Sequence, residues 1–242
     1  MSELTSDKFI LRLAELRPIE NRNKADGRKQ PEDDRFLGIR MGDVFKLGKE
    51  FSAMPVVEVE KLMESPAHMV RVGALSIMGQ SAKGRQCTPS RLKELYQLYI
   101  RRHDRINTWD LVDLAAYYVV GQYLADKSRK PLYKLARSKD QWERRTAIVA
   151  TAHFILKMKE VDDTFAIAEI LVNDKEESVN KGTGWMVRAA GDVDRKRLLK
   201  FLDKYAASMP RVLLRYSIEK LPKDQREHYM KLRKGLGADD RG

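Results

Sequence analysis

A tryptophan and a carboxylate stand four residues apart in the segment Trp109-Asp110-Leu111-Val112-Asp113. On a helix, this spacing places the side chains of Trp109 and Asp113 on one face, one turn apart. An indole face attracts cations and a carboxylate supplies a countercharge, whereas burial of an unpaired carboxylate in a core is costly. The pair therefore suits a site that binds a positively charged group.

The other two tryptophans extend this pattern. Trp142 and Trp185 are each followed three residues later by an arginine, Arg145 and Arg188 respectively. We expect all three tryptophans at or near helix starts in successive repeats, where aromatic and charged side chains share one surface. Trp142 is interpreted as a core residue, because an aromatic side chain packs easily at a helix start. Trp185 joins Trp109 as a candidate for function.

Arginines recur at repeat-like intervals on the same helices. A line of arginines on one surface would follow the phosphates of a nucleic acid. The alternative for any one of them is a surface salt bridge. The candidates for phosphate contacts are Arg71, Arg144, Arg145, Arg188, Arg211 and Arg215.

The elements that position these residues are predicted to be helices. Apolar residues recur with helical spacing, Thr88-Pro89 has the form of a helix start, and no useful length of chain alternates with period two. Asp43 is expected to cap one helix. Further helices are expected over residues 8–16, 55–63, 106–124, 141–157 and 194–206, among others.

The predicted helices come in pairs, and the pairs repeat. Spacings of 31–40 residues are typical of stacked helical hairpins. We therefore predict an all-α fold: a right-handed superhelix of stacked antiparallel, HEAT-like helix pairs, in one domain over residues 1–242. A polar loop at 17–34 either contacts phosphates or is a disordered connector. The second helices should start near Pro66, Ile106, Gln141, Glu177 and Ser208.

The composition favours a polyanionic partner. The chain has 47 lysines and arginines against 35 aspartates and glutamates, a formal net charge of +12. The alternative is a charged, solvated surface that binds nothing. No run of 18 apolar residues predicts a membrane span, and the polar first residues do not resemble a secretory signal. Cys87 is the one cysteine, which excludes an internal disulfide and indicates the cytoplasm.

Other chemistries find little support in the residue pattern. The four histidines (His68, His103, His153 and His228) are scattered without metal-ligand spacing, so no metal is expected. The segment Gly182-Thr183-Gly184 lacks the lysine that follows the glycines of a phosphate-binding loop. A catalytic triad has no signature.

Several segments resemble the AlkD-like DNA alkylation repair family, which are HEAT-like-repeat DNA glycosylases. The resemblance implies a monofunctional enzyme that, without a cofactor, excises positively charged N-alkylated purines, such as 7-methylguanine and 3-methyladenine, from duplex DNA in base-excision repair. The family often has a glutamate after its last site arginine, where this chain has Ala189. The resembling segments, in order, are 35–40, 109–113, 142–149, 179–188 and 209–216.

The resemblance also implies roles for individual residues. The catalytic aspartate matches Asp113, the two site tryptophans match Trp109 and Trp185, and the site arginines match Arg145 and Arg188. The carboxylate would stabilise the sugar cation and orient the attacking water. We expect a monomer that acts on alkylated DNA at the nucleoid. Two alternatives stay open: a non-catalytic repeat protein that binds damaged or branched DNA, and a protein-binding solenoid.

Overall fold

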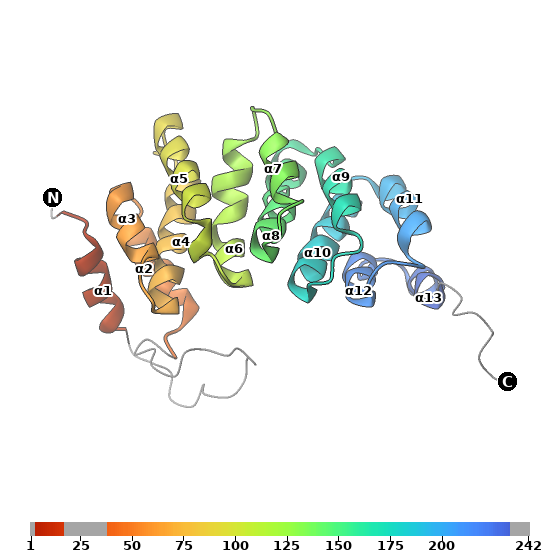
Figure 1. Ribbon diagram of the computed structural model, residues 1–242, viewed down its shortest axis with the longest axis horizontal. Helices are drawn as coiled ribbons and strands as arrows, with labels where there is room; N and C mark the ends of the chain where they lie inside the picture. The colour runs from red at the N-terminus through yellow and green to blue at the C-terminus, as the bar shows by residue number, and fades with distance from the viewer. Residues whose placement is uncertain (1–2, 17–37, 233–242) are drawn as a thin grey trace. The chain divides into compact units, whose positions relative to one another are not determined.

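The computed structural model describes residues 3–16 and 38–232 of the chain. These residues form helices and no strand, so the predicted all-α class of stacked antiparallel helix pairs is confirmed (Figure 1). The predicted polar loop at 17–34 lies outside the described residues. So do the first three residues of the 35–40 segment.

The helices fall into two compact units, Met1–Tyr123 and Leu124–Gly242. The prediction of a single domain over 1–242 stays a prediction. The first unit contains α1 (Ser6–Ala14), α2 (Met41–Glu50), α3 (Val56–Met63), α4 (His68–Lys83), α5 (Pro89–Arg101), η1 (His103–Arg105), α6 (Trp109–Ala115) and η2 (Ala116–Gly121). The second contains α7 (Lys130–Leu135), α8 (Gln141–Ala150), η3 (Phe154–Met158), α9 (Asp162–Leu171), α10 (Glu177–Val193), α11 (Arg195–Tyr205), α12 (Arg211–Ile218) and α13 (Lys223–Lys231).

In the first unit, α4 is the central helix. It packs against α2, α3, α5 and α6, and nearly all its side chains are buried. A helix that is surrounded on all sides has no polar face to show in its sequence, and the polar residues of α4 are therefore small or paired. The π-helix η2 also packs against α4, and the ring of Phe9 from α1 lies against Gly73 of α4.

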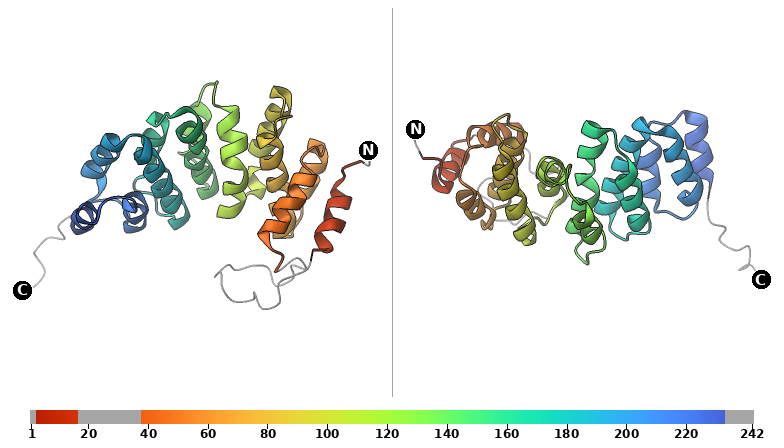
Figure 2. Two further views of the ribbon diagram at one scale, coloured as in Figure 1. Left: turned by 180° about the vertical axis from the view of Figure 1, so that it is seen from behind. Right: turned by 90° about the horizontal axis from the view of Figure 1, so that it is seen from above.

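In the second unit, α10 has the corresponding place. It packs against α8, α9, α11 and α12, and its buried stripe includes Val179, Met186 and Val187. Figure 2 shows both units from behind and from above, with the helices of each pair running side by side. Within the ranges that the structure describes, no helix is both long and apolar enough to cross a membrane.

The repeat prediction locates the second helices well. They are α4, α6, α8, α10 and α12, and each begins within three residues of the predicted position. The Thr88 prediction is also confirmed, because its hydroxyl accepts a hydrogen bond from the Arg91 amide while Pro89 occupies the first turn of α5. Helix periodicity and capping residues were sufficient here, since both act within a few residues of one another.

Three helix boundaries differ from the prediction. Asp43 lies inside α2, whose N-cap is the extended residue Arg40. The helix expected over 106–124 starts at Trp109 and widens into a π-helix at Ala116. The helix expected over 141–157 ends at Ala150, and the π-helix η3 follows it. A π-turn inserts one residue but leaves the side chains near helical spacing, so periodicity cannot detect it.

Candidate nucleic-acid interface

The first unit presents Trp109 and Asp113 together on α6. Trp109 is the first residue of the helix and its side chain is 44% exposed, while Asp113 is half-buried one turn further on. The predicted shared face is thus a consequence of helix geometry and is present. We call these two residues the α6 row. An exposed indole beside a carboxylate can meet a cation from solvent.

Behind the α6 row lies a buried polar pair that the sequence did not reveal. His68 Nε2 on α4 lies 2.9 Å from Asp110 Oδ2 on α6, and both side chains are almost completely buried. A buried carboxylate is tolerated where a partner compensates for its lost hydration. Forty-two residues separate the two, so no local spacing rule could have paired them.

Arg71 does not lie on the exposed face of its unit. It is 8% exposed, and its Nη1 donates to the carbonyl oxygens of Ser65 and Pro66, each at 2.8 Å. Its Nη2 also reaches Asn107 Oδ1 at 3.4 Å. These contacts tie the segment before α4 and the segment before α6 to the α4 helix.

Arg144 is held by protein groups in the same way. It forms a two-pronged ion pair with Asp174, with Nε to Oδ2 at 2.5 Å and Nη2 to Oδ1 at 3.1 Å. Its Nη1 donates to the carbonyl oxygens of Ser138 and Lys139. The carboxylate raises the pKa of Arg144, mainly through this hydrogen bonding. Arg144 therefore connects the start of α8 to the segment before α10.

Arg145 lies between α8 and α10. It is 5% exposed, and its Nη1 donates to the carbonyl oxygen of Ser178. A Cβ at position 182 would stand 3.1 Å from that nitrogen, so Gly182 leaves room for the guanidinium group. The glycines of the Gly182-Thr183-Gly184 segment thus serve helix packing inside α10, which agrees with the absence of a phosphate-loop pattern.

Trp185 is not near a helix start, which corrects the expectation that all three tryptophans share one position in the repeat. It lies eight residues beyond the first residue of α10, whereas Trp109 begins α6 and Trp142 is second in α8. The helix itself begins at Glu177 as predicted, so the expectation failed only in calling a residue in the middle of a 17-residue helix close to its start. Trp142 is half-buried, while Trp185 is 37% exposed.

Around Trp185, the second unit exposes an aromatic and cationic surface. Lys181, Trp185 and Arg188 follow one face of α10, and α12 adds Arg215 and Tyr216. We call these five residues the α10–α12 surface. Arg188 pairs with Glu219, and Lys181 pairs with Glu177 at 2.6 Å, which raises the pKa of Lys181.

Tyr216 was missed by the sequence reasoning. Its side chain is 37% exposed, and its Cβ would be 2.5 Å from a Cβ added at Gly184, one residue before Trp185. Close approach of α10 and α12 at this glycine therefore brings the two aromatic residues onto adjoining helices. Its exposure depends on how α12 packs against α10, so helix periodicity alone did not single it out.

The last two predicted arginines differ in their contacts. Arg211 donates from Nη2 to the carbonyl oxygen of Met230 at 2.6 Å, near the end of α13. Arg215 is exposed and forms no hydrogen bond or ion pair with the residues that the structure describes. Of the six predicted arginines, Arg188 and Arg215 lie on the α10–α12 surface, while Arg71, Arg144 and Arg145 are mostly enclosed by protein.

One hollow of the described chain is lined by none of the predicted site residues. That hollow, of about 270 Å³, lies between α9 and α11, with Phe165 and Phe201 beside the cation of Arg197. Within the same described ranges, no three histidine, cysteine or acidic side chains gather where they could hold a metal ion. The candidate interface therefore consists of two surfaces, the α6 row in the first unit and the α10–α12 surface in the second.

Both units have the architecture of a helical-repeat protein with exposed aromatic and charged side chains. A family profile described as "DNA alkylation repair enzyme" matches residues 13–221, which is most of the chain. The chain belongs to this family of DNA alkylation repair enzymes. A search among curated proteins found no match.

Proposed function

We propose that the protein is a monofunctional DNA glycosylase that removes positively charged N-alkylated purines, such as 7-methylguanine and 3-methyladenine, from duplex DNA. Membership of the repair family supports action on alkylated DNA. The observation that carries the finer proposal is the α6 row, where an exposed indole stands one turn from a half-buried carboxylate. The indole suits the cationic base, and the carboxylate suits the positive charge that develops on the sugar.

The reaction presents positive charge twice. Alkylation at N3 or N7 makes the purine cationic, and cleavage of the glycosidic bond then develops positive charge on the deoxyribose. In the proposed mechanism, Asp113 stabilises the sugar cation and orients the attacking water, while the departing base carries away the bonding electron pair. The indole of Trp109 interacts with the cationic base, at about 0.5–2 kcal/mol. No cofactor enters this scheme.

The α10–α12 surface would bind DNA from the second unit. Arg188 and Arg215 would contact phosphates, and the exposed ring of Trp185 has the same capacity for cations as Trp109. For Arg71, Arg144, Arg145 and Arg211, and for Arg188 with its partner Glu219, the proposed phosphate contacts require that their present protein contacts be shared or exchanged. The proposed phosphate contacts therefore rest most directly on Arg215.

The decisive test is release of free base from methylated duplex DNA. We expect the wild-type protein to release 7-methylguanine, and Asp113→Asn to lower the single-turnover rate at least about a hundred-fold while still binding the DNA. Asp104→Asn is the matched control, because Asp104 is an exposed aspartate of the same unit that pairs with Arg102. It should leave the rate unchanged.

The possible outcomes separate the candidate functions. Equal rates for the wild type and Asp113→Asn would rule out the role of this carboxylate. Tight binding of damaged or branched DNA without any free base would favour the non-catalytic repeat protein. Absence of DNA affinity at about 0.1 M salt would point to a protein-binding solenoid.

A further inference from the structure

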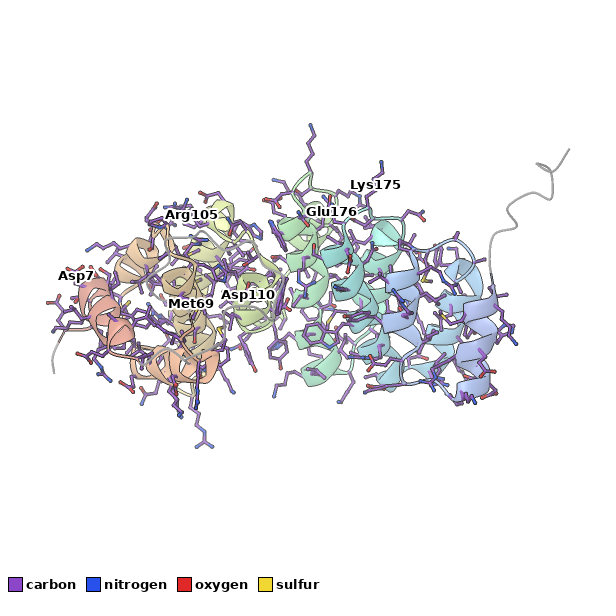
Figure 3. The ribbon with its side chains drawn as sticks, turned by 90° about the horizontal axis from the view of Figure 1, so that it is seen from below. Asp7, Met69, Arg105, Asp110, Lys175 and Glu176 are labelled. Atoms are coloured by element: carbon purple, nitrogen blue, oxygen red, sulfur yellow. The ribbon has the colours of Figure 1, made fainter. Side chains whose placement is uncertain are left out.

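Helix α6 makes close contact with α4 at two points. At the first, His68 Nε2 lies 2.9 Å from Asp110 Oδ2, with side-chain exposures of 7% and 6%. At the second, a Cβ added at Gly79 would stand 2.6 Å from the carbonyl oxygen of Leu114, so the backbones are in direct contact. Figure 3 labels Asp110 and also Met69, the residue that follows His68.

These two points lie on one row of α6. Asp110 and Leu114 are four residues apart, so they stand one above the other on the side of the helix that meets α4. Trp109 and Asp113 have the same spacing one residue earlier and form the neighbouring row. Because a helix turns as a rigid element, fixing the first row against α4 sets the direction in which the second row points.

The His68–Asp110 pair joins α4 to the first turn of a short helix. The helix has seven residues, and the Thr108 side chain at its N-cap forms no capping hydrogen bond. The segment before it is held from α4 again, by the contact of Arg71 with Asn107. The first turn of α6 therefore meets α4 through the buried His68–Asp110 pair, and the segment before it meets α4 through Arg71.

We propose that His68 is a positioning residue for Trp109 and Asp113. It acts through Asp110 and does not itself contact the damaged nucleotide. A productive arrangement of catalytic groups tolerates only about 10–20° of misorientation, which a loosened short helix readily exceeds. This inference rests on the proposed function for its catalytic consequence, whereas the orientation of Trp109 can be measured independently of any activity.

The catalytic arm compares two substitutions of His68. His68→Leu retains bulk but cannot hydrogen-bond to Asp110, whereas His68→Gln retains a side-chain donor. We expect His68→Leu to lower the single-turnover rate of base release by roughly ten- to a hundred-fold, with the Kd for DNA unchanged within about threefold. His68→Gln should recover most of the rate. All rates are measured well below the unfolding midpoint of each variant.

A matched control separates positioning from a general loss of stability. Tyr229→Phe removes the hydrogen bond from the Tyr229 hydroxyl to Asp203 Oδ1, which is 2.7 Å long and lies in the second unit. It should lower stability without changing the rate of base release. A rate loss in Tyr229→Phe equal to that in His68→Leu would overturn the inference.

The structural arm uses 5-fluorotryptophan and ¹⁹F NMR of the full chain. The three tryptophans give three resonances, assigned from single Trp→Phe variants. We expect His68→Leu to shift or split the Trp109 resonance and to leave those of Trp142 and Trp185 in place. An unmoved Trp109 resonance, or equal movement of all three, contradicts the inference.

The two arms also distinguish the two proposals. If the wild type releases no base, the proposed glycosylase function fails and the ¹⁹F spectrum alone decides the role of His68. If the wild type is active and His68→Leu is equally active, the glycosylase function stands and the positioning role is overturned.

Discussion

Arginines of the same sequence pattern have different environments in this protein. Arg144 has its guanidinium group enclosed by the carboxylate of Asp174 and two carbonyl oxygens, whereas Arg215 projects into solvent. Both were predicted to contact phosphates from their place in the repeat. At the scale of the residue, the available partners decide which of the two can bind a ligand without giving up protein contacts.

This difference predicts opposite effects of two equivalent substitutions. Arg144→Met should lower the free energy of unfolding by about 3 kcal/mol, because Asp174, 6% exposed, would lose the partner of its buried charge. Arg215→Met should change that free energy by less than about 0.5 kcal/mol but weaken DNA binding. Urea unfolding and fluorescence anisotropy with labelled duplex DNA measure the two effects. Similar behaviour of the two variants would contradict the distinction.

At the scale of the helices, Gly184 allows α10 and α12 to approach each other closely. A Cβ at this position would lie 2.5 Å from Tyr216 Cβ and 2.7 Å from the carbonyl oxygen of Leu213. Gly184→Ala should therefore force α12 away from α10 and destabilise the second unit by about 1–3 kcal/mol.

Gly42→Ala provides the comparison for this substitution. Gly42 lies within α2, and nothing stands within 4 Å of a Cβ added there. Alanine is the better helix former, so we expect a gain of roughly 0.5–1 kcal/mol. Amide hydrogen exchange reports each unit separately, and a loss of stability at Gly42 comparable with that at Gly184 would argue against the packing explanation.

The hydrogen bonds that attach α1 to Glu58 on α3 predict that the stability of the fold depends on pH. Both the amide and the hydroxyl of Ser6 donate to Glu58 Oε2 at 2.8 Å. Hydrogen bonds from Lys61 and Ser6 lower the pKa of Glu58 from 4.5 to about 2. Because this pKa is lower in the folded chain, the carboxylate stabilises the fold above about pH 4.5, and that contribution is lost as the pH falls towards 2.

Thermal unfolding across this pH range tests the attachment. We expect the wild type to lose more stability than Glu58→Gln between pH 4.5 and pH 2, because glutamine has no charge to lose. Parallel curves for the two proteins would show that Glu58 does not link proton binding to folding.

For the whole molecule, the net charge of +12 is the relevant quantity. If the chain neutralises six to ten phosphates, its affinity for undamaged duplex DNA should fall by roughly a thousand-fold or more between 50 and 200 mM salt. Titrations at several salt concentrations give the number of phosphates from the slope. Removing Arg188 or Arg215 should reduce that number by about one each, whereas a flat slope would exclude phosphate contacts as the source of binding.

The helical architecture was accessible from the sequence because its signals are local. Helix spacing, the Thr88 cap and the repeat period placed five second helices within three residues. Long-range packing was not accessible. The partners of Arg144 and Arg145 lie about thirty residues away in the sequence.

The residues of the candidate site also divide into those that local spacing predicted and those that depend on long-range packing. The shared face of Trp109 and Asp113 came directly from their spacing, and Trp185 and Arg215 are also exposed on their helices. Tyr216 and the His68–Asp110 pair were missed, since exposure and burial depend on how α12 meets α10 and how α6 meets α4. Spacing predicts which side chains share a face, but neighbouring helices determine which face is open.

The packing of α4 and α10 mainly on helices close to them in the chain has a consequence for how the protein folds. In each unit the contacts join elements one or two hairpins apart, so forming them closes short loops. Such local topologies fold quickly, and growth can begin at more than one hairpin and spread to its neighbours. The units should consequently gain and lose structure progressively, with α1 and α13, which pack against few of the helices that the structure describes, opening first.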